Sequence, residues 1–325
     1  MSDLQPHDQE PSGSDPAGQP EVVLSEPGIW ATDTGEAFGA RPIVRRRKAA
    51  PITDHAWVVR TADSTEMPLA TRLRTSWPLL RMYSMRQIQL RYRQSVLGLS
   101  WTVVQPVAIM AIYGSIFTIF LKVDGGGLPY LSVAWAGLTV WMYVQAAVQM
   151  GTVSLQNDAW LLGRVWFPRE IIPLAPVVAG LIDLAVAGVI LFGIVIFQGL
   201  GLSIHLLALP LIVAVLVAWC AAISVFCAAI TIFMRDMATI VSLGLRLLFI
   251  ATPVMYPETT VPVHLRWVNA ANPFAVVTNT TRATVLSHVW PNWGLLGFHL
   301  LIGGVLFVGA LWYLTAIERR IVDVV

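Results

Sequence analysis

The chain has 325 residues, of which 56% are apolar and only 12% are charged, and its formal net charge is +2. Its mean hydropathy is +0.68. This composition excludes an ordinary soluble globular protein and predicts an all-α integral membrane protein.

The first 70 residues differ from the rest of the chain. Residues 1–40 carry eight Asp or Glu and no Lys or Arg, and Gly, Ser and Pro are frequent. A segment of this composition buries too little apolar surface to offset the entropy lost on ordering. Residues 1–70 are therefore predicted to form a disordered cytoplasmic tail, and they show no signal-peptide pattern.

Six apolar stretches follow, each compatible with a helix that crosses about 30 Å of hydrocarbon, for which about 20 residues are needed. Polar residues, Gly or Pro mark the breaks between them. The six stretches predict a transmembrane domain at 101–317, with spans at Trp101–Leu121, Leu128–Met150, Ile171–Phe197, Leu206–Phe233, Ala238–Met255 and Trp293–Ile317.

The positive residues predict the orientation of these spans. Cytoplasmic loops carry an excess of Lys and Arg, so both termini, including residues 318–325, are predicted to be cytoplasmic in a multi-pass plasma-membrane protein. Lys122, Arg266 and Arg282 fall on the other side of the membrane. Eleven arginines fall on the side of the termini, namely Arg72, Arg74, Arg81, Arg86, Arg91, Arg93, Arg164, Arg169, Arg235, Arg319 and Arg320.

The segment before the last span, Tyr256–Asn292, is in places too apolar for a solvated loop. Asn272-Pro273 is typical of a helix start, with Asn as the N-cap and Pro at the first helical position. A short pair of re-entrant helices within 257–292 explains both features, because such backbone is tolerated in a membrane where protein covers it. An outer loop with surface helices is the alternative.

The sequence lacks the motifs of a catalytic or nucleotide site. A phosphate-binding loop needs a Lys after its last Gly and before Ser or Thr, but the only lysines, Lys48 and Lys122, are followed by Ala and Val. Neither H-E-x-x-H nor G-x-S-x-G occurs. We therefore expect no enzyme activity, no metal and no cofactor in this chain.

Two charges, Asp183 and Arg246, fall near the centres of predicted spans. An ionisable residue at the bilayer midplane costs about 2.5–3.5 kcal/mol or more, and it normally faces protein or water. We predict either that the two side chains pair or that Arg246 faces a substrate pathway.

Six motifs over roughly residues 75–325 resemble the polysaccharide-exporting permeases of the ABC type-2 family, in the family's order. The motifs are Arg86–Pro106, Trp166–Leu174, Phe233–Asp236, Thr252–Pro257, Asn272–Phe274 and Glu318–Asp323. The resemblance implies two copies of this permease with two copies of a separate cytoplasmic ATPase, which binds ATP and Mg. It also implies export of a lipid-linked polysaccharide, such as an O-antigen, a teichoic acid or a cell-wall galactan precursor.

The resemblance further implies an amphipathic segment at 71–100 on the cytoplasmic membrane surface. Its Arg86, Arg91 and Arg93 suit the pyrophosphate of a lipid-linked sugar, because guanidinium groups bind phosphate in a bidentate manner. Binding of these arginines to anionic membrane lipid is the alternative. We expect no nucleic-acid partner.

Residues from Asn157 to Gly163 are predicted to form a short helix with Asn157 as its N-cap. This helix would expose large apolar side chains to the cytosol, which is unfavourable unless a partner covers them. The residues assigned to coupling with the ATPase are Trp160, Leu161, Arg164 and Arg169. Packing of this helix on the bilayer surface is the alternative.

The aromatic residues Tyr113, Phe117 and Phe120 follow one another at helical spacing on the first span. Sugar rings pack their C–H faces on aromatic rings, so this stripe is a candidate lining for a glycan channel, with core or lipid packing as the alternative. Asn272 and Pro273 are assigned to an outer gate. A drug or lipid exporter of the same family, or a membrane glycosyltransferase, remains the alternative function.

Overall fold

The computed structural model describes residues 22–25, 29–32, 69–93, 100–120, 122, 125–158 and 168–324. The chain divides into two units, Met1–Val59 and Arg60–Val325. In the first unit, β1 (Val22–Ser25) and β2 (Ile29–Thr32) form an antiparallel pair in which Val22 faces Thr32 and Ser25 faces Ile29. The sequence predicted no element in this tail, most of which lies outside the described residues.

The second unit consists of helices. The main helices are α1 (Leu69–Arg93), α2 (Trp101–Ser115), α3 (Tyr130–Asn157), α5 (Ile171–Phe197), α6 (Leu209–Thr231), α7 (Met237–Ala251), α8 (Arg266–Ala271), α9 (Pro273–Val285) and α10 (Trp293–Val324). A π-helical turn, Ile116–Phe120, extends α2. The 3-10 helices are η4 (Ile204–Ala208), η5 (Glu258–Thr260) and η6 (Val263–Leu265).

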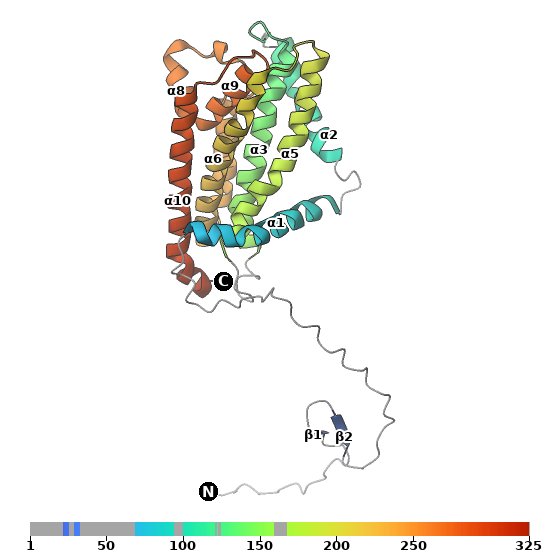
Figure 1. Cartoon of the computed structure of the whole chain (residues 1–325), viewed down its shortest axis with the longest axis vertical. Helices are drawn as coiled ribbons and strands as arrows, with labels where there is room; N and C mark the ends of the chain where they lie inside the picture. Colours follow the sequence, from blue (N-terminus) through green and yellow to red (C-terminus); the bar gives the residue numbers. More distant parts are fainter. Residues whose placement is uncertain are drawn as a thin grey trace, which may run out of the picture. The chain divides into compact units, whose positions relative to one another are not determined.

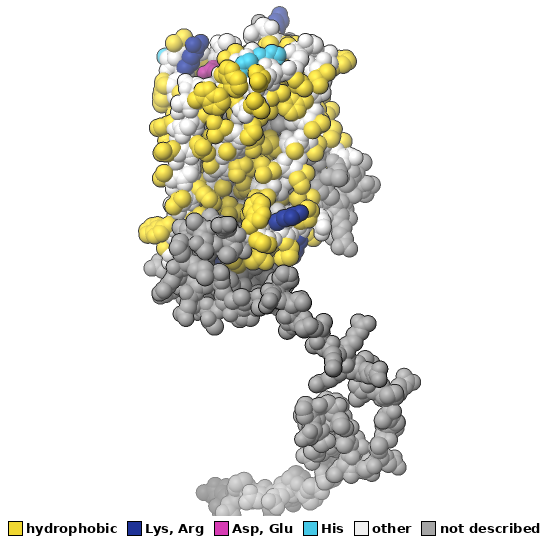
Figure 2. Space-filling model, viewed as in Figure 1, with side chains coloured by type: hydrophobic (Ala, Val, Ile, Leu, Met, Phe, Trp, Pro, Cys, Tyr) yellow, Lys and Arg dark blue, Asp and Glu magenta, His cyan; other side chains and the backbone are white. Residues whose placement is uncertain are grey.

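Four of these helices form the body of the bundle (Figure 1). Helix α3 packs extensively against α5 and α6, and α6 packs against α10. Among the described residues, these four helices, with η4 as the start of the third, are long and apolar enough to cross a membrane. Figure 2 shows hydrophobic side chains over much of the face of this bundle. The apolar segments Val103–Ile119 and Met237–Ala251 are shorter, so the six-span count stays a prediction, as does the re-entrant placement of α8 and α9.

Helix α1 lies across the end of the bundle near which α10 finishes (Figure 1). It packs against α5, and it buries Ser76, Tyr83 and Ser84 while leaving Trp77 and Met82 more than half exposed. The face that meets the bundle is thus partly polar, and large apolar side chains point away from it. The apolar side chains described on α1 are therefore not confined to one face of the helix.

The predicted boundaries agree best where Gly, Pro and charges interrupt long apolar stretches. Helix α5 has the bounds predicted for the third span, Ile171–Phe197. Helix α10, by contrast, continues past Ile317 to Val324. The prediction that Asn157 is the N-cap of a new helix is wrong, because Asn157 is the last residue of α3. Asn is a common N-cap residue, but here the preceding helix continues as far as Asn157.

Small residues let α3 and α6 approach closely. A Cβ placed at Gly151 on α3 would lie 2.5 Å from the side chain of Ser224 on α6. The Ser224 hydroxyl donates a hydrogen bond to the Ala147 carbonyl on α3 at 3.2 Å. Close backbone approach with a hydroxyl bridge is the usual way in which helices associate within a membrane.

Arg282 on α9 links several elements by hydrogen bonds at the end of the bundle opposite α1. Its guanidinium group, only 7% exposed, donates hydrogen bonds to Val133 O on α3 at 2.9 Å and to Pro253 O at 2.6 Å. It also donates to the carbonyls of Val254 and Tyr256 in the turn after α7. One side chain thus joins α3, α9 and this turn, to which we refer as the 252–256 turn.

Two further residues complete the hydrogen bonding of the 252–256 turn. The Tyr130 hydroxyl at the start of α3 donates to Met255 O at 2.9 Å. The Asn272 amide donates to the Thr252 hydroxyl at 2.9 Å, while its oxygen accepts from the backbone N–H groups of Phe274 and Ala275. Asn272 is therefore the N-cap of α9, with Pro273 as its first residue, as the sequence predicted.

We expect Arg282→Lys to destabilise the protein, because a single ammonium group cannot replace the guanidinium fork at four carbonyls. Leaving buried carbonyls unpaired costs roughly 2 kcal/mol or more, so the midpoint of thermal denaturation in detergent should fall by several degrees. Arg266→Lys is the matched control, because Arg266 is exposed at the start of α8. Equal midpoints for both variants would show that the Arg282 contacts contribute no stability.

Candidate functional site

Two cavities lie side by side along α3, and they share the lining residues Ile109, Met142, Gln145 and Gln149. We name each cavity after its ionisable residue. Helices α2, α3 and α7 enclose the Arg246 cavity, whereas α2, α3 and α5 enclose the Asp183 cavity. Their volumes are about 590 and 480 Å³, respectively.

The Arg246 cavity combines a cation, amides and aromatic rings. Arg246 is exposed on α7, and Ser242 lies one helical turn before it. The ring of Phe249 packs against Tyr113 and Trp141, with centroid distances of 5.8 and 5.5 Å. The full lining comprises Ile109, Tyr113, Leu138, Trp141, Met142, Gln145, Gln149, Ser242, Leu245, Arg246, Phe249 and Ile250.

Gln145 and Gln149 separate the two cavities. They are four residues apart, so they lie on the same face of α3, and both are exposed. The sequence analysis did not select these residues, although two amide side chains on one face of an apolar span indicate a polar surface there. An amide both donates and accepts hydrogen bonds, so this face of α3 suits a ligand that carries hydroxyl groups.

The structure places Asp183 and Arg246 in different cavities. Asp183 lines the cavity between α3 and α5, and Arg246 lines the cavity between α3 and α7. The pairing of the two side chains and a pathway role for Arg246 both stay predictions.

The predicted aromatic stripe on the first span is interrupted. Tyr113 lines the Arg246 cavity, whereas Phe117 is half-buried in the π-helical turn and packs against the core. The side chain of Phe120 lies outside the described residues. A π turn places more residues in each turn than an α-helix does, so residues spaced four and three apart no longer share one face there.

At the end of the bundle where α1 lies, Tyr83 on α1 is buried near the end of α3. The tyrosine is 3% exposed, and its burial, together with the nearby Asp158 carboxylate, raises the pKa of its hydroxyl above the usual value. Arg86 lies 5.5 Å above the Tyr83 ring in a cation–π arrangement. Asp158 is the C-cap of α3, so Tyr83 lies near the residue that precedes the predicted coupling segment.

The residues predicted to couple to an ATPase fall mostly outside the described part of the chain. Trp160, Leu161 and Arg164 are not described, and neither are the side chains of Arg91 and Arg93. Arg169, just before α5, is only 9% exposed. Its guanidinium group therefore offers little surface to a docking partner.

Comparison with known proteins decides the family. The model of the family described as ABC-2 type transporter matches residues 78–286. The chain belongs to this family. The matched residues extend from α1 to the end of α9 and include both cavities, and they confirm the resemblance that the six motifs indicated. This ABC-2 protein is thus a multi-pass membrane permease.

Three relatives share one name, "O-antigen export system permease protein RfbA". The protein from Myxococcus xanthus is 28% identical over 176 residues, which cover 54% of this chain and 67% of the relative. A protein from Klebsiella pneumoniae is 28% identical over 199 residues, or 61% of this chain and 76% of the relative. Another from the same organism is 26% identical over 249 residues, or 76% of this chain and 94% of the relative.

We expect Tyr83→Ala to loosen α1, because the variant removes a buried ring that belongs to the hydrophobic core. Truncation of a buried aromatic ring costs about 3 kcal/mol or more, so local opening of α1 should become roughly a hundredfold more frequent. Limited trypsin digestion measures this opening as cleavage after Arg81 or Arg86. Trp77→Ala on the exposed side of α1 is the control, and equal cleavage rates in both variants would contradict the packing of α1 through Tyr83.

Proposed function

We propose that this chain is the transmembrane permease of an ATP-driven exporter that moves a lipid-linked polysaccharide from the cytoplasm to the outer side of the plasma membrane. The names of its relatives support the polysaccharide substrate. The observation that carries the proposal is the exposed Arg246 within an apolar helix, beside the amides and aromatic rings of its cavity.

An exposed arginine on this helix is unfavourable if the helix faces lipid, because charge at membrane depth is costly without water or a partner. A water-filled path removes this cost. The guanidinium group suits a phosphate of the lipid-linked substrate. Gln145 and Gln149 suit sugar hydroxyls, and the rings of Tyr113 and Phe249 suit the C–H faces of sugars.

A second copy of the chain completes this path. Helix α7 buries only Leu245 within the chain, and its Ile240, Leu243 and Leu247 are more than half exposed. Helix α2 likewise exposes Ile112 and Tyr113. Two copies that meet along α2 and α7 enclose the Arg246 cavities between them and cover these apolar side chains.

Energy comes from a separate cytoplasmic ATPase that binds ATP and Mg, because this sequence lacks a phosphate-binding loop. With both termini cytoplasmic, α1 and the end of α3 lie on the ATPase side of the membrane. Tyr83, which is buried on α1 near Asp158, then transmits movement of the segment after α3 to α1. In this arrangement the 252–256 turn, with Asn272 and Pro273, lies at the outer gate.

Arg246→Gln should leave the assembled complex intact but lower export of the lipid-linked polysaccharide about tenfold, since a charge-assisted hydrogen bond contributes about 1.5–3 kcal/mol. Surface labelling of the polysaccharide in cells measures export, and co-purification with the ATPase checks assembly. Arg266→Gln removes the same charge from an exposed site outside the cavity. Normal export by Arg246→Gln would exclude Arg246 from the pathway.

In proteoliposomes, we expect polysaccharide transport to require this chain, the ATPase and hydrolysable ATP together. The isolated permease should bind no ATP, since its sequence has no site for the phosphates. ATP-independent formation of glycosidic bonds by the isolated chain would instead identify a membrane glycosyltransferase, and ATP-driven release of free lipid without glycan would identify a lipid exporter.

A further inference from the structure

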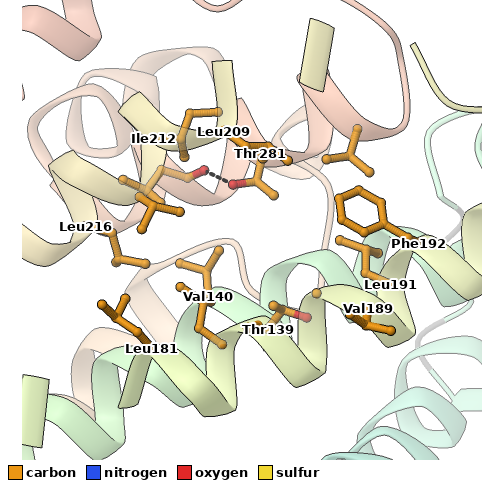
Figure 3. A pocket seen from close by; sticks show the side chains of 16 residues that line it. Thr139, Val140, Leu181, Val189, Leu191, Phe192, Leu209, Ile212, Leu216 and Thr281 are labelled. Atoms are coloured by element: carbon orange, nitrogen blue, oxygen red, sulfur yellow. Dashed lines mark hydrogen bonds between the residues drawn. The ribbon is translucent and has the colours of Figure 1, made fainter. Parts of the chain in front are cut away.

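A third cavity lies between α3, α5, α6 and α9 (Figure 3); it shares Thr139 and Leu184 with the Asp183 cavity and no residue with the Arg246 cavity. Its volume is about 420 Å³, and 16 residues line it. All are apolar or glycine except Thr139 and Thr281, whose hydroxyls donate to the carbonyls of Trp135 and Val277 in their own helices. The cavity therefore presents no unsatisfied side-chain donor, and its lining suits a hydrocarbon. We refer to it as the apolar cavity.

The apolar cavity is elongated along the helix axes. Its residues on α5 run from Leu181 to Phe192 over consecutive turns, which corresponds to about 16 Å at 1.5 Å per residue. Val189 lines the edge of the cavity and is 69% exposed, so the cavity opens onto the surface of the chain. A long, narrow, laterally accessible space in a membrane-spanning bundle fits an extended chain better than a compact ligand.

A polar and aromatic cluster lies at one end of this cavity. His205 is four residues before Leu209, and His288 is three residues after Val285, while Leu209 and Val285 both line the cavity. The two imidazole rings stack with centroids 6.4 Å apart, and Trp290 packs on His205 at 4.6 Å. The Ser203 hydroxyl lies 2.6 Å from Nδ1 of His205, which orients the ring and leaves Nε2 as its remaining ring nitrogen.

We propose that the apolar cavity binds one acyl chain of a membrane phospholipid, with the phosphate of the headgroup at His205 and His288. The lining excludes polar groups, the surrounding bilayer supplies hydrocarbon at this depth, and the rim supplies N–H donors and an indole, a side chain typical of the membrane interface. The site does not include Arg246 or its cavity. With the orientation proposed above, this end of the cavity faces the outer leaflet, and only this placement rests on the proposed function.

Gly188 on α5 provides a direct test, because it lines the cavity and a Cβ placed there meets no atom within 4 Å. The Cβ of a larger residue is therefore accommodated here, and a phenylalanine side chain at this position occupies space within the cavity. Gly193 is the matched control, since it lies on the same helix, has equal room for a side chain and does not line the cavity.

The measurement is native mass spectrometry of the full chain, extracted from the membrane and titrated with a two-chain phospholipid. Exclusion of even a few methylene groups should lower retention of the tightest-bound phospholipid roughly tenfold in Gly188→Phe. Gly193→Phe should match the wild type. Gly188→Leu is a smaller second variant with the same expected direction. Wild-type retention by both folded Gly188 variants, or tight binding of single-chain prenyl phosphates alone, would overturn the proposal.

The headgroup contact has a separate test. Diacylglycerol carries the same two chains as a phospholipid but lacks the phosphate, so the wild type should retain it less well. His205→Ala should reduce this preference several-fold, because it removes a donor to phosphate. His264→Ala is the control, as His264 is exposed on η6 and distant in sequence from the cavity. An unchanged preference for phosphate in His205→Ala would place the headgroup elsewhere and overturn this part of the proposal.

Discussion

The hydrogen bonds of Arg282 position the elements that form the candidate pathway. The carbonyls of the 252–256 turn point inward, where water cannot satisfy them, and buried carbonyls need partners. Arg282 supplies donors to three of these carbonyls and to Val133, and Tyr130 supplies one to Met255. Since α7 ends at this turn and α3 begins beside it, these bonds fix the distance between α3 and the end of α7 that joins the turn, and they leave the other end of α7 unconstrained.

The packing divides the molecule into a tightly packed body and two loosely attached helices. Helices α3, α5, α6 and α10 share the most extensive contacts, and no room for a Cβ remains where Gly137 meets the 252–256 turn or where Gly303 meets Trp219. Helices α2 and α7 bury few side chains by contrast. Conformational change for transport therefore costs least if α2 and α7 move relative to the body.

Much of the fold was predictable because membrane spans depend on local composition. The bounds of α5 and the cap of α9 at Asn272 depend on residues that are neighbours in sequence. The role of Arg282 was not predictable, because its bond to Val133 joins residues 149 positions apart, and charge counting placed it in an outer loop. The placement of Asp183 and Arg246 in different cavities likewise depends on which faces of α5 and α7 meet α3, which spacing within one helix does not specify.

The π-helical turn at Ile116–Phe120 has a consequence for how related chains are compared. Its hydrogen bonds span one more residue than those of an α-helix, so removing a single residue there restores regular winding without changing the helix ends. A homologue with a regular helix should therefore contain one residue fewer between Tyr113 and Gly125. An ungapped alignment of such a chain would be correct on one side of the turn and shifted by one position on the other, and the shift would assign cavity-lining residues to the wrong face.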